Sequence, residues 1–142
     1  MATFQVVDQF VYHALQKLID MDTDTFKAVL TNTAPTKAGT DVIGDITQIG
    51  GTGGYAPVTL TGVALAETGA GTGIWEFTCD PFAWTPSGAA FDSARYIAIY
   101  DDTATNDAVL GFLDMGSSVA VADAATLTVT PGANGVAQFT VA

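Results

Sequence analysis

Hydrophobic residues recur at three- and four-residue steps near the start of the chain, a period typical of an amphipathic α-helix. One apolar stripe results, made by Val7, Phe10, Val11, Ala14, Leu15 and Leu18. The pattern predicts a helix at about residues 5–19, which ends before the acidic run 20–25 because Asp and Thr bond locally to the backbone and favour turns. His13 lies on the polar face, so we expect its imidazole to be solvated.

After residue 25 the pattern changes to short runs of β-branched and aromatic residues, separated by Gly, Pro, Asn and Asp. Such runs are typical of strands and turns. They predict strands near residues 25–32, 45–49, 57–63, 73–79, 94–100, 108–114, 118–122, 125–130 and 135–141. Residues 96–100 are apolar on both faces, which indicates a central strand.

Many short strands without helical patterns between them favour antiparallel sheets over a βαβ fold. We therefore expect a mainly β protein, with an antiparallel β-sandwich of the Ig-like or jelly-roll-like kind and one N-terminal amphipathic helix. A small β-barrel is the alternative. At 142 residues the chain has the length of one domain, and no fixed repeat divides it, so residues 1–142 are expected to form a single domain.

Charge narrows the classes of partner. Fifteen acidic residues stand against four basic ones, for a net charge of -11. Duplexes and anionic membranes are bound through clusters of Lys and Arg, so we expect neither nucleic acid nor membrane as a partner. No window approaches the roughly 20 apolar residues of a membrane span, and the N-terminus lacks a signal-peptide pattern, which predicts synthesis in the cytoplasm.

Residues suited to catalysis are few. His13 is the only histidine, and no serine has the Gly-x-Ser-x-Gly context of a hydrolase nucleophile. Cys79 alternates with Trp75 and Phe77 on one strand face, which favours a buried thiol over a reactive one. Paired carboxylates are not excluded by spacing, but most acidic residues lie in predicted turns. We expect no enzymatic activity, no catalytic residues and no cofactor.

Asp20, Asp22 and Asp24 resemble the opening of a calcium-binding EF-hand loop. Such a loop requires Gly at its sixth position and Glu at its twelfth, where this chain has Thr25 and Thr31. The pattern therefore favours an acidic turn over a cation site, and we expect no bound metal.

Two aromatic regions are candidates for binding. The glycine-rich run 50–54 lacks the Gly-Lys-Ser/Thr of a phosphate cradle, so it predicts a flexible loop that leads into Tyr55 and becomes ordered on contact with a partner. Phe82 and Trp84 favour a position that caps the core. The alternative is a sugar-stacking patch that uses Trp84 and Tyr55.

The order of these motifs resembles a widespread family of small tailed-phage virion proteins, and the similarity spans nearly the whole chain. Each stretch alone is ordinary strand-and-turn sequence, but their order together is distinctive. The stretches that carry the resemblance are residues 8–11, 24–35, 45–49, 53–55, 80–88, 95–103 and 110–118. Most members of that family have no assigned role, so no functional residue is carried over from it.

The resemblance implies a virion component that is encoded among head and tail genes. With the small size, acidity and lack of catalytic motifs, we expect a capsid decoration (cement) protein that binds the outer shell, with the major capsid protein or other virion proteins as partner. A homo-oligomer is expected, and a trimer suits local three-fold positions. The alternatives are a tail, neck or fibre component of the virion and a carbohydrate-binding adhesion module.

Two segments are the candidate contact elements for such a partner. One is the apolar stripe of the predicted helix, and the other is the end of the glycine-rich loop. The expected partner-binding residues are Val7, Phe10, Val11, Leu15, Gly53, Gly54 and Tyr55.

Overall fold

The structure is a computed structural model of the chain and describes residues 3–141. Short extended segments dominate it, as expected for runs rich in Val, Ile, Thr and aromatic residues. The strands are β1 (Phe4–Val6), β2 (Phe26–Thr31), β3 (Val58–Thr59), β4 (Ala64–Glu67), β5 (Ile74–Thr78), β6 (Phe82–Trp84), β7 (Ala94–Asp101), β8 (Val109–Val119), β9 (Leu127–Val129) and β10 (Ala137–Thr140). The helical segments are the α-helix α1 (Gln9–Leu15) and the 3-10 helices η1 (Ile43–Asp45) and η2 (Thr52–Gly54).

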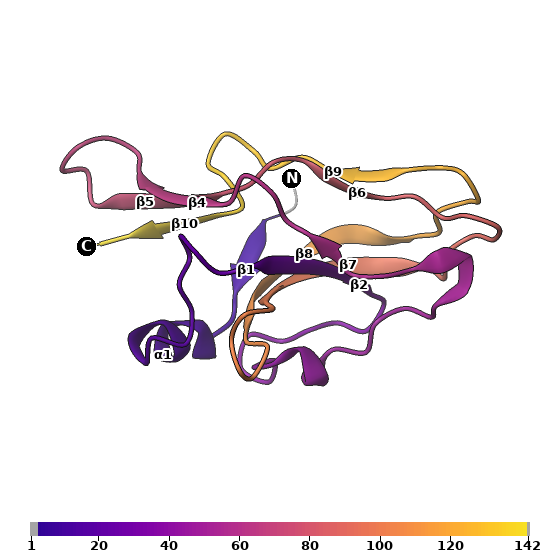
Figure 1. The fold of residues 1–142 in the computed structure, drawn as a ribbon, viewed down its shortest axis with the longest axis horizontal. Helices are drawn as coiled ribbons and strands as arrows, with labels where there is room; N and C mark the ends of the chain where they lie inside the picture. The colour runs from indigo at the N-terminus through magenta and orange to yellow at the C-terminus, as the bar shows by residue number, and fades with distance from the viewer. Residues whose placement is uncertain (1–2, 142) are drawn as a thin grey trace.

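The strands form two layers (Figure 1). One layer is a five-stranded sheet with the order β1-β8-β7-β2-β3, and the other holds a three-stranded sheet, β10-β5-β4, beside a two-stranded sheet, β6-β9. Neighbouring strands pair antiparallel throughout these sheets. The predicted fold class, mainly β and antiparallel with one N-terminal helix, is confirmed, and the layers have a sandwich-like arrangement.

The core lies between the two layers. Phe26 of β2 and Phe77 of β5 are both 0% exposed, and their rings meet edge to face with centroids 5.0 Å apart. Ile97 and Ile99 of β7 are buried toward the same core, and Ala98 is buried on the opposite face of that strand. β7 is therefore a central strand covered on both faces, as its apolar run predicts.

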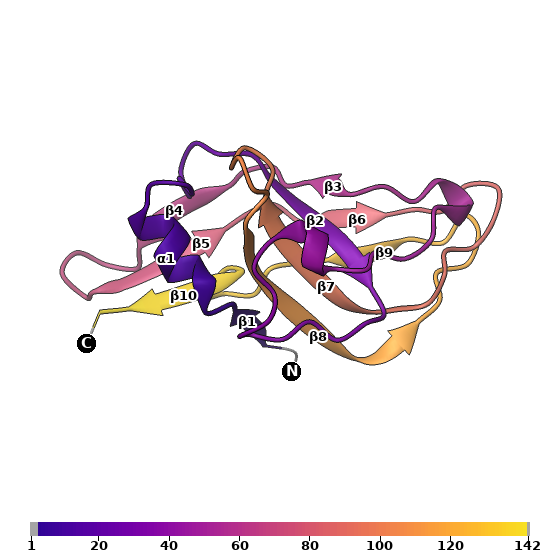
Figure 2. The same ribbon diagram turned by 90° about the horizontal axis from the view of Figure 1, so that it is seen from below.

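α1 lies across the three-stranded sheet, at one end of the molecule (Figures 1 and 2). Phe10 stacks on Phe139 of β10, with ring centroids 5.4 Å apart. The helix is thereby fixed to the sheet by its own aromatic residue, and only one side of it is covered.

The helix is shorter than the predicted residues 5–19. Residues 4–6 form β1 and pair with β8, because sheet pairing outweighs the weak helix preference of so short a segment. At the other end Lys17 takes the left-handed conformation with φ +60°, and the Leu18 N–H donates to the His13 carbonyl oxygen. This is a Schellman cap with Lys where Gly is usual, so no glycine marks the end in the sequence.

The strand predictions also need correction. Residues 45–49 do not form a strand. After η1 this segment meets β2 at an isolated bridge between Thr31 and Gln48, and the Thr31 hydroxyl also donates to the Thr47 carbonyl oxygen at 2.6 Å. The sequence pattern does not predict β4 or β6. The predicted strand 108–114 lies almost wholly in β8, which passes through Gly116 at φ +86° and ends at Val119. Of the predicted strand 118–122, only residues 118 and 119 therefore belong to a strand.

Candidate protein-interaction surface

α1 exposes large apolar side chains to solvent. Val11 is 58% exposed, Tyr12 56% and Leu15 79%, whereas Phe10 and His13 are buried. Val11 and Leu15 are four residues apart and therefore lie on the same side of the helix. A surface helix normally turns its apolar stripe toward the core, so this exposed apolar side requires an explanation.

The other exposed large apolar side chains come from the same end of the molecule. Leu18 follows α1, Trp75 lies near the start of β5, and Val141 follows β10. Figures 1 and 2 place α1, the start of β5 and the end of β10 together. Within residues 3–141, all the exposed large hydrophobic residues belong to this group, which we call the helical end surface: Val11, Tyr12, Leu15, Leu18, Trp75 and Val141.

The predicted contact stripe is only partly on this surface. Val11 and Leu15 belong to it, as described above. Val7 is 1% exposed and Phe10 is 5% exposed, so both side chains pack into the protein's own core and are not accessible to a partner. Tyr12 and Trp75 were not among the expected contact residues, because Tyr12 lies outside the apolar stripe and Trp75 was grouped with Phe77 and Cys79 on one strand face.

The glycine-rich loop is held by contacts within the protein. The Gly53 carbonyl oxygen accepts the Ser87 N–H at 2.9 Å, and a Cβ at Gly53, which has φ +66°, would lie 2.3 Å from the Ala89 carbonyl oxygen. Gly54 is exposed and has φ +73°. The prediction of a flexible loop is therefore not supported, since η2 packs closely against the segment that follows β6.

Tyr55 anchors the same loop to the five-stranded sheet. Its hydroxyl oxygen accepts the Leu30 N–H at 2.8 Å and lies 3.2 Å from Oε1 of Gln48. Its ring meets Phe91 edge to face, with centroids 5.6 Å apart. Burial raises the pKa of Tyr55, so the phenol stays neutral and serves as a structural contact.

Replacing Tyr55 with Phe should lower the free energy of unfolding by about 1–3 kcal/mol, because the Leu30 N–H would lose its acceptor in the interior. Urea denaturation of the two proteins measures the difference. Tyr12→Phe is the matched control, since Tyr12 is 56% exposed and its hydroxyl makes no hydrogen bond within the described residues. Equal losses in the two variants would contradict an anchoring role for Tyr55.

Trp84 and Phe82 are buried, which confirms the expectation that they cap the core. Trp84 is 3% exposed, and its indole N–H donates to the Ala56 carbonyl oxygen at 3.1 Å. Its ring meets that of Phe82 edge to face. Trp84 therefore presents no free ring face on which a sugar could stack, and the carbohydrate-binding alternative loses this suggested residue.

His13 is buried, which corrects the prediction of a solvated imidazole. It is 5% exposed, and its Nε2 lies 2.5 Å from Oδ1 of Asp41. A second bond joins the Asp8 N–H to the Lys37 carbonyl oxygen near the start of α1. These contacts bind α1 to the segment 37–41 and fix which side of the helix faces outward.

The acidic run after α1 is a hydrogen-bonded turn. Asp20 Oδ1 accepts the N–H groups of Asp22 and Thr23, and Asp24 Oδ2 accepts the Asp20 N–H. The N–H bond from Asp22 is the main reason that the pKa of Asp20 is lowered. Within residues 3–141 no group of three or more His, Cys, Asp or Glu side chains is arranged to hold a metal ion.

Cys79 follows β5 and is half-buried. Burial, with a smaller contribution from the charge of Asp80, raises the pKa of its thiol to about 11. The thiolate form is therefore scarce at neutral pH, as expected of a structural cysteine.

The basic side chains are partly used in ion pairs. Lys27 Nζ lies 2.7 Å from Asp102, and Arg95 makes two hydrogen bonds of 2.9 Å to the carboxylate of Asp114. These pairs leave a surplus of acidic side chains on the surface, in keeping with the net charge of -11. The helical end surface is thus an apolar region on an acidic protein.

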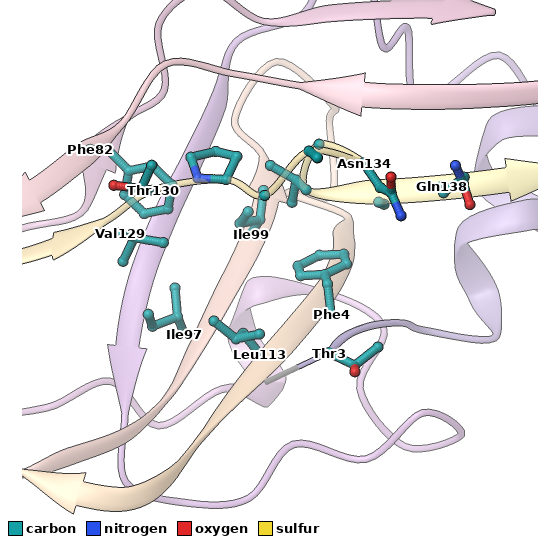
Figure 3. Close-up of a pocket in the computed structure, with 16 residues that line it drawn as sticks. Thr3, Phe4, Phe82, Ile97, Ile99, Leu113, Val129, Thr130, Asn134 and Gln138 are labelled. Carbon is teal, nitrogen blue, oxygen red and sulfur yellow. The ribbon is translucent and has the colours of Figure 1, made fainter. Parts of the chain in front are cut away.

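A second feature is a narrow cleft of about 670 Å³ between the two layers (Figure 3). Phe4, Leu113 and Ile97 line it on one side, and Val129 and the segment 130–138 on the other. None of its lining side chains is ionisable, and Ile97 and Ile99 are each only 2% exposed. The lining of the cleft is therefore uncharged and mostly apolar.

Comparison with known proteins found no similar protein, so the functional proposal below is based on the fold, the helical end surface and the sequence. No family model, no curated protein and no solved structure matches the chain. No helix within residues 3–141 is long and apolar enough to cross a membrane. The resemblance to phage virion proteins accordingly stays a prediction.

Proposed function

We propose that this chain is a non-enzymatic structural protein of a bacteriophage virion, a capsid decoration (cement) protein that attaches to the outer shell through the helical end surface. The observation that carries the proposal is the gathering of exposed apolar side chains at one end of an acidic molecule. Exposed patches of this kind mark protein-interaction sites. The sequence resemblance supports the same class.

The free energy available from burying the helical end surface is enough for each copy of the protein to bind its own site on the shell. Burial of a large apolar side chain contributes about 1.5–3 kcal/mol, and association itself costs at least about 4 kcal/mol. Six such side chains therefore support a specific contact for each copy. Because only the assembled shell would offer the site, binding would stabilise the shell by mass action.

The charge of the protein supports a partner other than a second copy at this surface. Each copy carries a net charge of -11, so two helical end surfaces would meet with strong repulsion between their surroundings. An apolar site with a basic rim on the major capsid protein fits better. Trimers, if formed, would use another face and would present three helical end surfaces to the shell together.

The test is to mix the purified protein with particles from a phage that lacks its gene, and to count bound copies by cryo-electron microscopy. Hundreds of copies over the shell, with α1 at the contact, are expected. A few copies confined to the portal or tail would instead assign a neck, tail or fibre role. Absence of binding to every part of the particle would contradict the proposal.

A further inference from the structure

Asp101, the last residue of β7, is a fully buried carboxyl group with an unused oxygen. Its side chain is 0% exposed. Oδ1 accepts the N–H groups of Thr103 at 2.8 Å and Ala104 at 3.1 Å, whereas Oδ2 has no hydrogen-bond partner among the described residues. A buried ionised oxygen without a donor is costly, so a neighbouring group has to satisfy it.

That neighbour is Asp24, in the turn between α1 and β2. The pairing of Phe26 with Asp101 and the bond from the Asp102 N–H to the Thr25 carbonyl oxygen bring Asp24 beside Asp101, with the two carboxyl groups within hydrogen-bonding reach. The other side of the Asp24 carboxyl group is occupied, since its Oδ2 accepts the Asp20 N–H at 2.7 Å. Two ionised carboxylates cannot hydrogen-bond to each other, because neither has a donor. One proton between them supplies the missing donor.

No basic side chain replaces that proton. Lys27, on the neighbouring strand β2, pairs with Asp102. Arg95 lies at the start of β7, at the far end of that strand from Asp101, and pairs with Asp114. The remaining titratable groups on these elements are acidic or neutral: Asp20 and Asp22 in the turn, Asp107 in the loop after β7, and Tyr96 and Tyr100 in β7. Nor does any group of three or more His, Cys, Asp or Glu side chains within residues 3–141 stand where it could hold a metal ion in place of the proton.

We propose that Asp24 and Asp101 share one proton, and that this shared proton fastens the turn between α1 and β2 to the loop after β7. Thr25 joins the same two segments, since its N–H donates to Thr103 Oγ1 and its carbonyl oxygen accepts the Asp102 N–H. Loss of the proton places two negative charges side by side and loosens this junction.

The junction controls the segment that carries α1. Ile19 and Met21, which connect α1 to the turn, are both buried in the core, so the turn and the end of the helix are held together through this short segment. Leu18 of the helical end surface lies in the same segment. Loosening of the junction would therefore disturb the helical end surface first, whatever that surface binds.

The direction of the pH effect follows from linkage. Burial, followed by the hydrogen bond to Asp24, raises the pKa of Asp101 from its ordinary value of 3.8 to about 7. Because the folded state holds a proton that the unfolded chain releases, the contribution of Asp101 to stability is fully present below about pH 4. It decreases as the pH rises to about 7 and does not return above it.

The direct test is a carbon-13 NMR titration of the aspartate side-chain carboxyl signals in the native protein. The expected result is a step near pH 7 in the signal of Asp101, far above its ordinary value of 3.8. Ionisation of Asp101 below pH 5 would overturn the proposal. Because the titration uses the free protein, its outcome is independent of the proposed function.

Asp101→Asn gives a second test. The amide oxygen would still accept the N–H groups of Thr103 and Ala104, and the amide N–H would donate to the Asp24 carboxylate at any pH, so no shared proton is needed. Its melting temperature should exceed that of the native protein by a margin that grows between pH 4 and pH 7, to about 5 °C. Asp22→Asn removes the same charge from an exposed position in the same turn and should show no such growth.

A divalent cation is the competing occupant of the pair. Addition of calcium at pH 8 should leave the melting temperature of the native protein and of Asp101→Asn equally changed. If calcium raised the melting temperature of the native protein alone, the pair would bind a cation in place of the proton, and the proposal would be wrong.

Discussion

Replacing Phe77 with Ala should lower the free energy of unfolding by about 3–5 kcal/mol. Phe77 is 0% exposed and meets Phe26 across the gap between the two layers. The change removes the ring that joins the three-stranded sheet to the five-stranded sheet, and the surrounding strands cannot close the cavity without moving apart from their partners. A loss of that size is a large share of the roughly 5–15 kcal/mol that stabilises an ordinary domain.

Guanidinium denaturation followed by near-ultraviolet circular dichroism measures the change, with Leu15→Ala as the control. Leu15 is 79% exposed, so its truncation should change stability by no more than about 0.5 kcal/mol. A loss below about 1 kcal/mol for Phe77→Ala would show that the two layers do not depend on this contact.

The strands with the clearest alternation or apolar runs were predictable from the sequence. β2 and β7 lie at the centre of the five-stranded sheet, where burial on both faces selects Val, Ile and Leu. β4 has the sequence Ala-Leu-Ala-Glu, which favours helix, and β6 has only three residues beside Pro81. β4 is a strand because it pairs with β5, and β6 because it pairs with β9. Such pairing cannot be predicted from the local sequence.

The direction in which α1 faces was not predictable from its period. The apolar stripe spans a wide arc, and the structure turns the helix so that Phe10 and His13 face inward while Val11 and Leu15 face outward. The contact that fixes this orientation joins His13 to Asp41, far along the chain. The pattern of hydrophobic residues cannot predict that a histidine is buried when its carboxylate partner lies far away in the sequence.

The same reason explains the acid pair. Asp24 and Asp101 each lie where turns are expected, and Asp is common in turns for its local hydrogen bonds. Only the antiparallel pairing of Phe26 with Asp101, at the end of the β2–β7 ladder, brings the two acidic residues together. A sequence can predict that each Asp lies in a turn. It does not predict that the two turns are neighbours, because that depends on the register of the strands that connect to them.

Changing Val11 and Leu15 together to Asp should reduce binding to the capsid at least about 100-fold while the protein stays folded. The two side chains together contribute about 3–6 kcal/mol if both are buried at the contact, and each 1.4 kcal/mol is tenfold in affinity. Both are exposed in the free protein, so the substitutions remove no contact of the core. Cosedimentation with particles that lack the protein measures binding, and circular dichroism measures folding.

Two controls separate docking from folding and from charge. Phe10→Ser should destabilise the free protein, because Phe10 is 5% exposed and stacks on Phe139, so its loss of binding would follow from loss of structure. Ala90→Asp with Ala122→Asp adds the same charge at exposed positions in loops next to the β6–β9 pair, away from α1 (Figure 1). That variant should bind normally. If the α1 variant also bound normally, the helical end surface would not be the docking face, and attachment to the shell would have to use the acidic faces instead.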